Sequence, residues 1–131
     1  MGFLNVFRNR KAVCTDAETK WDRMWDRWVK GVVESPYAEL MTYQGEINNG
    51  GHDQYFTNVE NKGNLEQELS ALETVLPEPL KQNLQTAYQA YWLLEEREEK
   101  AVETLEQCDR VFYAHEEEVQ QILKEFAAGM E

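Results

Sequence analysis

Apolar residues recur at three- and four-residue steps along most of the chain, which is the spacing of one face of an α-helix. Thr15 and Glu18 form a capping box, which predicts that the first helix starts there and runs to about Val33. The apolar stripe of this helix consists of Ala17, Trp21, Met24, Trp25, Trp28 and Val32. No segment alternates apolar and polar residues as a half-buried strand would, so the pattern predicts an all-α fold.

Three more helices are predicted between residues 35 and 76. Ser35 as cap and Pro36 as first helical residue start the second helix, which ends at the Asn-Gly-Gly sequence of residues 49–51. A short third helix covers residues 52–59, and residues 60–63 form a loop. Asn64 caps the fourth helix. The apolar stripe of this fourth helix is made of Leu65, Leu69, Leu72 and Leu76.

A long fifth helix is predicted after Pro77 and Pro79, in the C-terminal half of the chain. Its apolar stripe is interrupted where Glu95 and Glu98 occupy the positions at which buried residues are expected. We therefore expect this helix to leave the core near Glu95 and to expose an acidic segment. A last helix ends at Gly129. Its apolar residues are Val119, Ile122, Leu123 and Phe126.

These elements predict a single compact domain of about six helices over residues 14–131, preceded by an N-terminal arm of residues 1–13. The first, second, fourth and fifth helices should pack around one core. The turn at residues 49–51 should set the angle between the second and third helices. The expected core residues are Trp21, Trp25, Trp28, Leu69, Leu72, Tyr88 and Tyr91.

The whole chain has a net charge of −12, and its acidic residues are concentrated in the second half. Residues 1–65 carry eight Lys or Arg and nine Asp or Glu, a net charge of −1. Residues 66–131 carry five Lys or Arg and sixteen Asp or Glu, a net charge of −11. Such a field repels nucleic acids and anionic membranes and attracts basic surfaces. We therefore expect a partner protein with a basic surface and no direct binding of nucleic acid.

The sequence shows no sign of stable membrane insertion or of export. No apolar run approaches the roughly 20 residues that span a bilayer, and the N-terminus lacks the features of a secretory signal. Cys14 and Cys108 are far apart in sequence, which is typical of reduced thiols in a cytoplasmic protein. A disulfide bridge between these two cysteines is the less favoured alternative.

Four glutamates of the predicted long helix fall on one helical face. They follow one another at steps of four, four and three residues: Glu95, Glu99, Glu103 and Glu106. Neighbouring side chains on such a face are roughly 5–6 Å apart, which is comparable with the spacing of DNA phosphates, so the row could occupy a basic groove that otherwise holds DNA. Glu116 and Glu117 add a second acidic cluster. The alternative is a solvated face that only confers solubility.

The stretch of residues 46–58 contains the only Gly-Gly pair of the chain, between two helical segments. Asn49, Gly50 and Gly51 all tolerate positive φ, so the backbone can turn sharply at this point. One interpretation of the stretch is a structural corner between two helices. The other is a ligand site formed by four polar residues: Glu46, Asn49, His52 and Gln54.

This stretch resembles the signature of a bacterial domain family that is named after a DNA-mimic protein. The matching residues are Glu46, Ile47, Asn49, Gly50, Gly51, Gln54, Tyr55, Phe56 and Asn58. The resemblance covers about residues 37–126 and includes Asp109, Phe112 and Tyr113. The family usually has an aromatic or apolar residue where this chain has His52. The resemblance implies an all-helical fold and a protein that presents acidic groups to a partner, and it implies no activity.

The inventory of reactive side chains argues against an enzyme. His52 and His115 are the only histidines, and neither lies in a His-Glu-x-x-His or Glu-x-x-His pattern. No Gly-x-Ser-x-Gly motif and no phosphate-binding loop occurs. We therefore expect no catalytic residue, no metal and no cofactor. A metal site formed by Glu46, His52 and Asp53 is the weaker alternative.

The predicted function is non-enzymatic binding of a basic protein surface, with a DNA-binding protein as the candidate partner. One alternative is a small-ligand or metal site at the Asn-Gly-Gly turn. Another is a self-associating structural module, because Tyr88, Tyr91 and Trp92 would suit a homodimer interface wherever the core leaves them uncovered. The high net charge opposes self-association unless the acidic faces point away from the interface.

Overall fold

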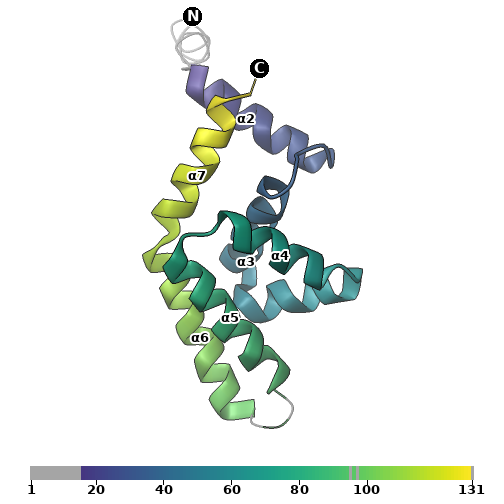
Figure 1. The fold of residues 1–131 in the computed structure, drawn as a ribbon, viewed down its shortest axis with the longest axis vertical. Coiled ribbons are helices and arrows are strands. Elements are labelled where there is room, and N and C mark those ends of the chain that lie inside the picture. The colour runs from purple at the N-terminus through teal and green to yellow at the C-terminus, as the bar shows by residue number, and fades with distance from the viewer. Residues whose placement is uncertain (1–15, 95, 97, 131) are drawn as a thin grey trace, which may run out of the picture.

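The computed structural model describes residues 16–94, 96 and 98–130 of the chain. Within these ranges the chain forms six helices and no strand: α2 (Asp16–Val29), α3 (Tyr37–Lys62), α4 (Leu65–Val75), α5 (Glu78–Trp92), α6 (Glu98–Ala114) and α7 (Glu116–Ala128) (Figure 1). The predicted all-α fold is therefore confirmed. The predicted arm of residues 1–13 and the capping residue Thr15 lie outside the described residues. None of the described helices is long and apolar enough to cross a membrane.

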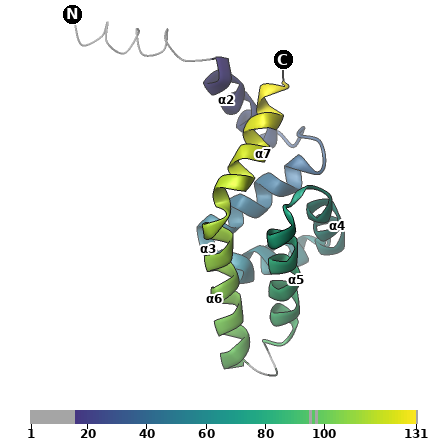
Figure 2. The ribbon, with the colours of Figure 1, turned by 60° about the vertical axis from the view of Figure 1, so that its left-hand side comes forward.

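Helices α6 and α7 follow one another almost end to end and form a column along the long axis of the molecule (Figure 1, Figure 2). With 17 and 13 residues at about 1.5 Å per residue, this column is roughly 45 Å long. Helix α5 packs antiparallel to α6, and α2 packs against α7 near the opposite end of the column. Helix α3 crosses the middle, where it contacts α4, α5, α6 and α7.

The prediction of a single long helix in the C-terminal half is wrong, because the segment forms a helical hairpin. Helix α5 ends at Trp92, the chain reverses, and α6 begins at Glu98. The chain tightens after α5, since the amides of Leu93 and Leu94 donate to carbonyls three residues earlier. The polar interruption of the apolar stripe therefore marks a turn. The stripe resumes because α6 packs back onto α5.

Helix α2 is shorter than predicted, and its apolar stripe is only partly covered. It ends at Val29 rather than near Val33, and Gly31 follows with a φ of 74°. Val32 is 64% exposed and Ala17 is also exposed, so neither residue belongs to the core. The contacts of α2 are mainly with α7, which covers only one side of the helix.

The fully buried core is centred on α3 rather than on the tryptophans of α2. Its largest side chains are Tyr43, Tyr55, Phe56, Phe112, Met24, Leu40, Met41, Ile47, Leu72, Leu80, Leu84 and Leu123. Leu72 was expected in this core and is fully buried. The other residues expected there are half-buried around its edge: Trp21, Trp25, Trp28, Leu69, Tyr88 and Tyr91. The tryptophan stripe is left at the edge because α2 lies at one end of the molecule (Figure 1).

The ends of α3 differ from the prediction. Pro36, not Ser35, occupies the N-cap position, and the Ser35 hydroxyl donates to the Glu39 carboxylate at 2.7 Å. The helix continues through most of the predicted loop and ends at Lys62. Gly63 then adopts a φ of 81°, and its amide donates to a carbonyl of the last turn. This glycine closes the helix as a left-handed cap.

Asn64 and Gly129 occupy the predicted positions at helix ends without the predicted chemistry. Asn64 precedes α4, but its side chain makes no capping hydrogen bond. Gly129 follows α7 with φ of −82° and ψ of −3°, which is a right-handed conformation rather than a left-handed cap. The positions of these helix ends are readable from the sequence, whereas their hydrogen bonds are not.

A buried carboxyl on α4 links that helix to α3. Glu68 is 8% exposed, and its Oε1 accepts a hydrogen bond of 2.8 Å from the hydroxyl of Tyr55. Burial raises the pKa of the Glu68 carboxyl from 4.5 to about 7, against the opposing effect of the Tyr55 hydrogen bond. The folded chain therefore holds this proton more tightly than the unfolded chain does.

Replacing Glu68 with Gln should stabilise the protein more at pH 8 than at pH 5, because Gln keeps an acceptor for Tyr55 but does not titrate. The folded-state pKa is the higher one, so the wild-type protein loses stability as the pH rises from 4.5 to about 7. The full shift corresponds to about 3 kcal/mol in the free energy of unfolding. Urea unfolding of both proteins at the two pH values measures the difference, and an equal gain at both would contradict the prediction.

Candidate protein-interaction surface

Helix α3 is bent at Gly51, in the middle of the motif of residues 46–58. Gly51 has a φ of 81° and a ψ of −175°, a conformation that residues with a Cβ avoid. Asn49 and Gly50 do not adopt positive φ. The break divides α3 into two helical segments, as the sequence predicted, but a single residue makes it.

Asp109 of α6 closes this kink from the side. The break frees the backbone amide of His52 from the helix, and this amide donates to Oδ1 of Asp109 at 2.8 Å. The same oxygen lies 2.6 Å from Nδ1 of the His52 ring. A carboxylate at the start of a helical segment also interacts favourably with the helix dipole. Asp109 therefore acts as an N-cap that another helix supplies.

The position of Asp109 also requires that residue 51 be glycine. A Cβ added to Gly51 would lie 2.4 Å from Oδ2 of Asp109 and 3.0 Å from its Cγ, closer than real Cβ atoms approach other atoms. The absent side chain leaves room for the carboxylate. Glycine thus provides both the backbone conformation and the close approach of α6 to α3.

His52 extends the hydrogen-bond network into the core. Its Nε2 lies 2.6 Å from the hydroxyl of Tyr43, and both side chains are fully buried. Burial raises the pKa of Tyr43, and the neighbouring Cys108 and Asp109 raise it further, so the hydroxyl keeps its proton. The ring of His52 thus makes one hydrogen bond at each nitrogen, with the Tyr43 hydroxyl at Nε2 and with the Asp109 carboxylate at Nδ1.

The second part of the family-like pattern meets the first part at the kink. Besides Asp109, it contains Phe112, whose ring packs edge-on against Tyr43 with the centroids 5.3 Å apart. It also contains Tyr113, whose hydroxyl donates to the carbonyl of Ile47 at 2.8 Å. Ile47 lies in the turn before the break, so α6 holds both sides of the kink.

The remaining polar residues of the motif contact different neighbours. Asn58 donates to the Glu46 carboxylate and thereby joins the two segments of α3. The side chain of Gln54 lies over Gly50, and Asn49 is exposed. The polar residues that the alternative interpretation assigned to a shared ligand are thus directed to separate contacts.

His52 is not available to bind a metal ion in this arrangement, because both of its ring nitrogens are already hydrogen-bonded. Asp53, the other member of the alternative site, is exposed. Among the described residues, no three His, Cys, Asp or Glu side chains are grouped as a metal site requires.

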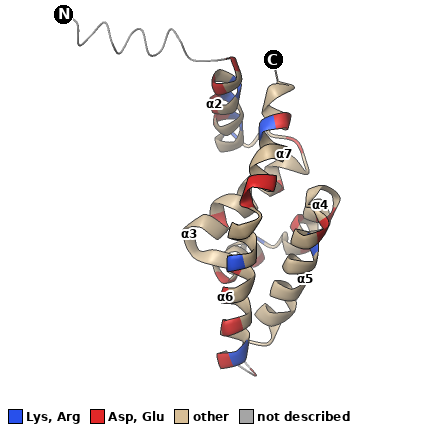
Figure 3. Ribbon diagram, turned by 90° about the vertical axis from the view of Figure 1, so that its left-hand side faces the viewer, with Lys and Arg blue, Asp and Glu red and all other residues tan. Residues whose placement is uncertain are grey.

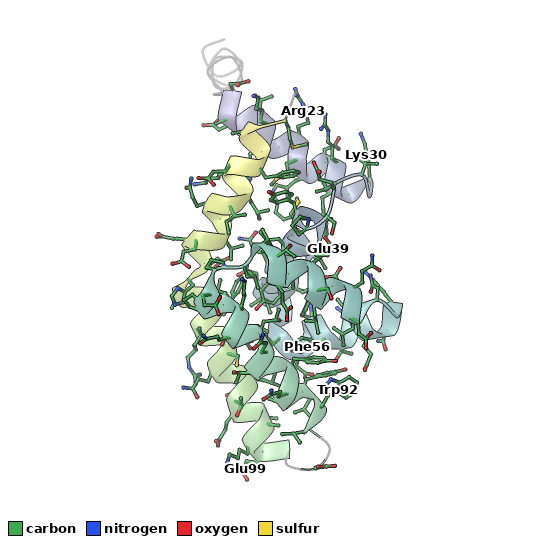
Figure 4. All side chains as sticks on the ribbon, viewed as in Figure 1. Arg23, Lys30, Glu39, Phe56, Trp92 and Glu99 are labelled. Carbon is green, nitrogen blue, oxygen red and sulfur yellow. The ribbon has the colours of Figure 1, made fainter. Side chains whose placement is uncertain are left out.

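Tyr55 and Phe56 anchor the second segment of α3 in the core, where both are fully buried. The Phe56 ring lies 5.7 Å from the ring of Tyr88 and 5.2 Å from that of Tyr91, measured between centroids. Figure 4 shows Phe56 between the helices, whereas Trp92 and Glu99 lie at the periphery. The aromatic residues of the motif are therefore structural.

Three of the four glutamates predicted as one row lie on α6. Glu99, Glu103 and Glu106 are exposed, and no Lys or Arg in the described part of the chain forms an ion pair with them. Figure 3 shows acidic residues along α6 and at the start of α7. Glu95, the fourth member, lies outside the described residues.

The second acidic cluster contains one open carboxylate and one that binds within the chain. Glu117 is exposed. Glu116 is half-buried, and its Oε2 accepts hydrogen bonds from the side-chain amides of Asn48 at 2.7 Å and Gln44 at 3.3 Å. These bonds join α7 to α3. Because the partners are distant in sequence, no local pattern distinguishes Glu116 from Glu117.

Two exposed cations of α6, Lys100 and Arg110, lie beside the acidic row. Arg110 lies four residues after Glu106, so at 3.6 residues per turn it falls on the same side of α6, and it is exposed. At the start of α7, Glu118 lies 3.5 Å from Nδ1 of His115. The open carboxylates thus form two groups, three on α6 and Glu117 on α7.

Replacing Gly51 with Ala should destabilise the fold, whereas replacing Gly50 with Ala should not. Alanine at position 51 must abandon the φ of 81° or displace Asp109, at an expected cost of about 3 kcal/mol. At position 50 a Cβ would meet only the flexible side chain of Gln54, so the change should stay within about 1 kcal/mol. Thermal unfolding followed by circular dichroism measures both. Equal effects would contradict the role assigned to Asp109.

Comparison with known proteins identifies the family. A family profile described as DMP19-like protein matches residues 36–129, which is most of the chain and includes both parts of the kink motif. No curated protein and no solved structure is significantly similar to the chain. The family match confirms the resemblance to a DNA-mimic family that the sequence motif indicated. The chain therefore belongs to the DMP19-like family.

Proposed function

We propose that this protein is a non-enzymatic interaction domain that binds the basic surface of a DNA-binding protein. Membership of the DMP19-like family supports a role of the DNA-mimic type. The basic side chains of the partner contact carboxylates of α6 and α7 in place of DNA phosphates. The net charge of −12 attracts such a partner over a distance and speeds the encounter.

The observation that carries the proposal is the open row of Glu99, Glu103 and Glu106. Steps of four and three residues correspond to rises of about 6 and 4.5 Å along α6. DNA presents one phosphate about every 3.4 Å of axis on each strand, so the spacing of its phosphates and the spacing of these carboxylates are of the same order. Basic side chains of a partner that reach successive phosphates can therefore also reach these carboxylates. Within the described chain the three carboxylates have no cationic partner, so binding a basic surface breaks no ion pair there.

The packing of the helices supports a fixed presentation of these charges. Helix α5 braces α6 along its length, and α2 braces α7. The contact of Asp109 with the kink ties the middle of the column to α3. Side chains on a rigid element lose less freedom on binding than those on a mobile loop, which leaves more of the interaction energy for affinity.

The environment of the reactive groups supports a non-enzymatic role. Burial raises the pKa of the Cys108 thiol to about 11, and Asp109 adds to the rise, so little nucleophilic thiolate forms at neutral pH. His52 has no exposed surface through which it could reach a substrate.

Neutralising the row should weaken binding of the partner. The substitutions Glu99→Gln, Glu103→Gln and Glu106→Gln keep the shape of each side chain and remove its charge. Exposed charge pairs contribute about 0.2–1 kcal/mol each. The wild-type chain captures partner proteins from an extract of its native cells, and the triple variant should bind the same proteins roughly 10-fold more weakly. Added duplex DNA should release the captured protein, because DNA and the acidic face compete for one surface.

The control for this experiment removes the same amount of charge from another side of the molecule. Glu66, Glu73 and Glu78 are exposed on α4 and at the start of α5, and their change to Gln gives the same net charge as the test variant. Equal binding by the test and control variants would contradict the proposal, as would a captured protein that duplex DNA does not release.

Self-association is a second candidate function, favoured by apolar surface near the turn between α5 and α6. Trp92 is 53% exposed and Leu93 is 45% exposed. If this surface forms a dimer interface, replacing Trp92 with Gln should convert the dimer to a monomer. Light scattering at low and high salt measures this, and a wild-type protein that is monomeric under both conditions would remove the candidate.

A further inference from the structure

A pocket of about 580 Å³ opens between α2, α3 and α7, beside the junction of α6 with α7. Its aromatic walls are formed by Trp21 and Trp25 of α2 and by Tyr113 of α6. The rings of the two tryptophans meet edge to face, with centroids 6.2 Å apart, so they hold each other in place. The pocket therefore presents ordered aromatic surface that the core does not use.

The polar part of the pocket offers carboxylates and amides. Glu116 and Glu117 line it, and no Lys or Arg of the described chain does. Gln44 donates through Nε2 to Oε1 of Gln120 at 2.7 Å as well as to Glu116. These internal bonds fix the carboxylate of Glu116 at the wall, while the carboxylate of Glu117 stays exposed. The charge of the pocket is therefore negative.

The titration of Tyr113 is consistent with this negative charge. Burial raises the pKa of its hydroxyl, and the carboxylates of Asp109 and Glu116 raise it further. The contribution of these carboxylates to the pKa of Tyr113 indicates a negative electrostatic potential at its hydroxyl. Such a potential favours a positively charged ligand.

Gly45 lies on the α3 side of the pocket with Gln44 and Asn48, and neither the backbone nor the packing requires a glycine at position 45. Its φ is not positive, and a Cβ built on it would meet no atom within 4 Å. A glycine inside a helix costs about 1 kcal/mol relative to alanine, so it stands out where no turn or close contact needs it. Its effect is to leave open space on this wall beside Gln44 and Asn48.

We propose that this pocket binds an arginine side chain of the basic partner, with the guanidinium group stacked on one indole ring of the Trp21–Trp25 pair, at the edge of the other, and hydrogen-bonded to Glu117. This inference rests on the proposed function and names the anchor of that interface. The planar guanidinium stacks on aromatic rings and carries five donors and no acceptor, which matches a wall of rings and acceptors. A lysine ammonium is compact and strongly hydrated, so it uses the ring surface less well.

The pocket is placed so that one partner surface can cover both it and the acidic row. Glu117 belongs to the pocket, and Glu106 ends the row on α6. Their positions are eleven residues apart, which corresponds to roughly 16 Å along the column of α6 and α7. A basic surface of ordinary size spans this distance, since a specific interface buries about 800 Å² on each partner.

The first test is a titration of the full chain with acetyl-arginine amide, followed through the indole N–H signals of the four tryptophans by NMR. The signals of Trp21 and Trp25 should shift saturably. The indole of Trp92, at the other end of the molecule on α5, should not. Acetyl-citrulline amide has the same shape without the charge, and it should bind at least about five-fold more weakly. Equal shifts of all four indoles, or equal binding of citrulline, would overturn the proposal.

A matched pair of variants tests the pocket itself. Gly45→Met places a side chain across the pocket, whereas Gly45→Ala leaves it open, and both residues favour helix. Neither substitution changes any charge. The Met variant should bind acetyl-arginine amide at least about ten-fold more weakly than the Ala variant. Circular dichroism confirms that both variants stay folded, and equal affinities of two folded variants would overturn the proposal.

The failure of this inference can be told apart from the failure of the proposed function. If the wild-type chain captures a DNA-releasable partner and Gly45→Met captures it equally well, the arginine pocket is overturned and the acidic interface remains. If the wild-type chain captures no such partner, the proposed function fails even where acetyl-arginine amide binds.

Discussion

The hydrogen bonds from His52 to Asp109 at the Gly51 kink are the constraint on which the arrangement of the helices depends. Without the carboxylate, the amide that the kink frees would lack its partner, at a cost of about 1–3 kcal/mol. Without the glycine, the carboxylate could not approach the backbone. The pair therefore determines how α6 lies against both segments of α3, and through α6 it determines the direction of the acidic face.

The buried residues of the family pattern on α6 and the acidic row lie on different sides of the same helix. Asp109 and Phe112 turn toward α3 and are needed for the fold. Glu103 and Glu106 turn toward solvent and have no part in the core. A match to the family pattern therefore identifies the scaffold, whereas the acidic row consists of surface residues that the pattern does not include.

The proposed interface combines two kinds of interaction with different roles. The open carboxylates of α6 act over a distance and in water, so they contribute more to the rate of encounter than to affinity. The pocket beside Glu117 adds aromatic surface and fixed acceptors, which are the features of the few residues that dominate binding energy in protein interfaces. Arg110 separates the two groups and restricts which arrangement of basic residues fits.

The sequence by itself determined the all-α class, the approximate places of most helix ends, the position of the kink and the concentration of acid in the second half. Apolar periodicity carries this information because it reports which face of each helix is buried. It does not report against what that face packs. Only the tertiary structure showed that the polar interruption near Glu98 is a turn, since α6 folds back on α5. Only the tertiary structure showed that Glu116 is hydrogen-bonded within the chain whereas Glu117 is exposed. The amides that bind Glu116 come from α3, which is too distant in sequence for a local pattern to reveal the contact.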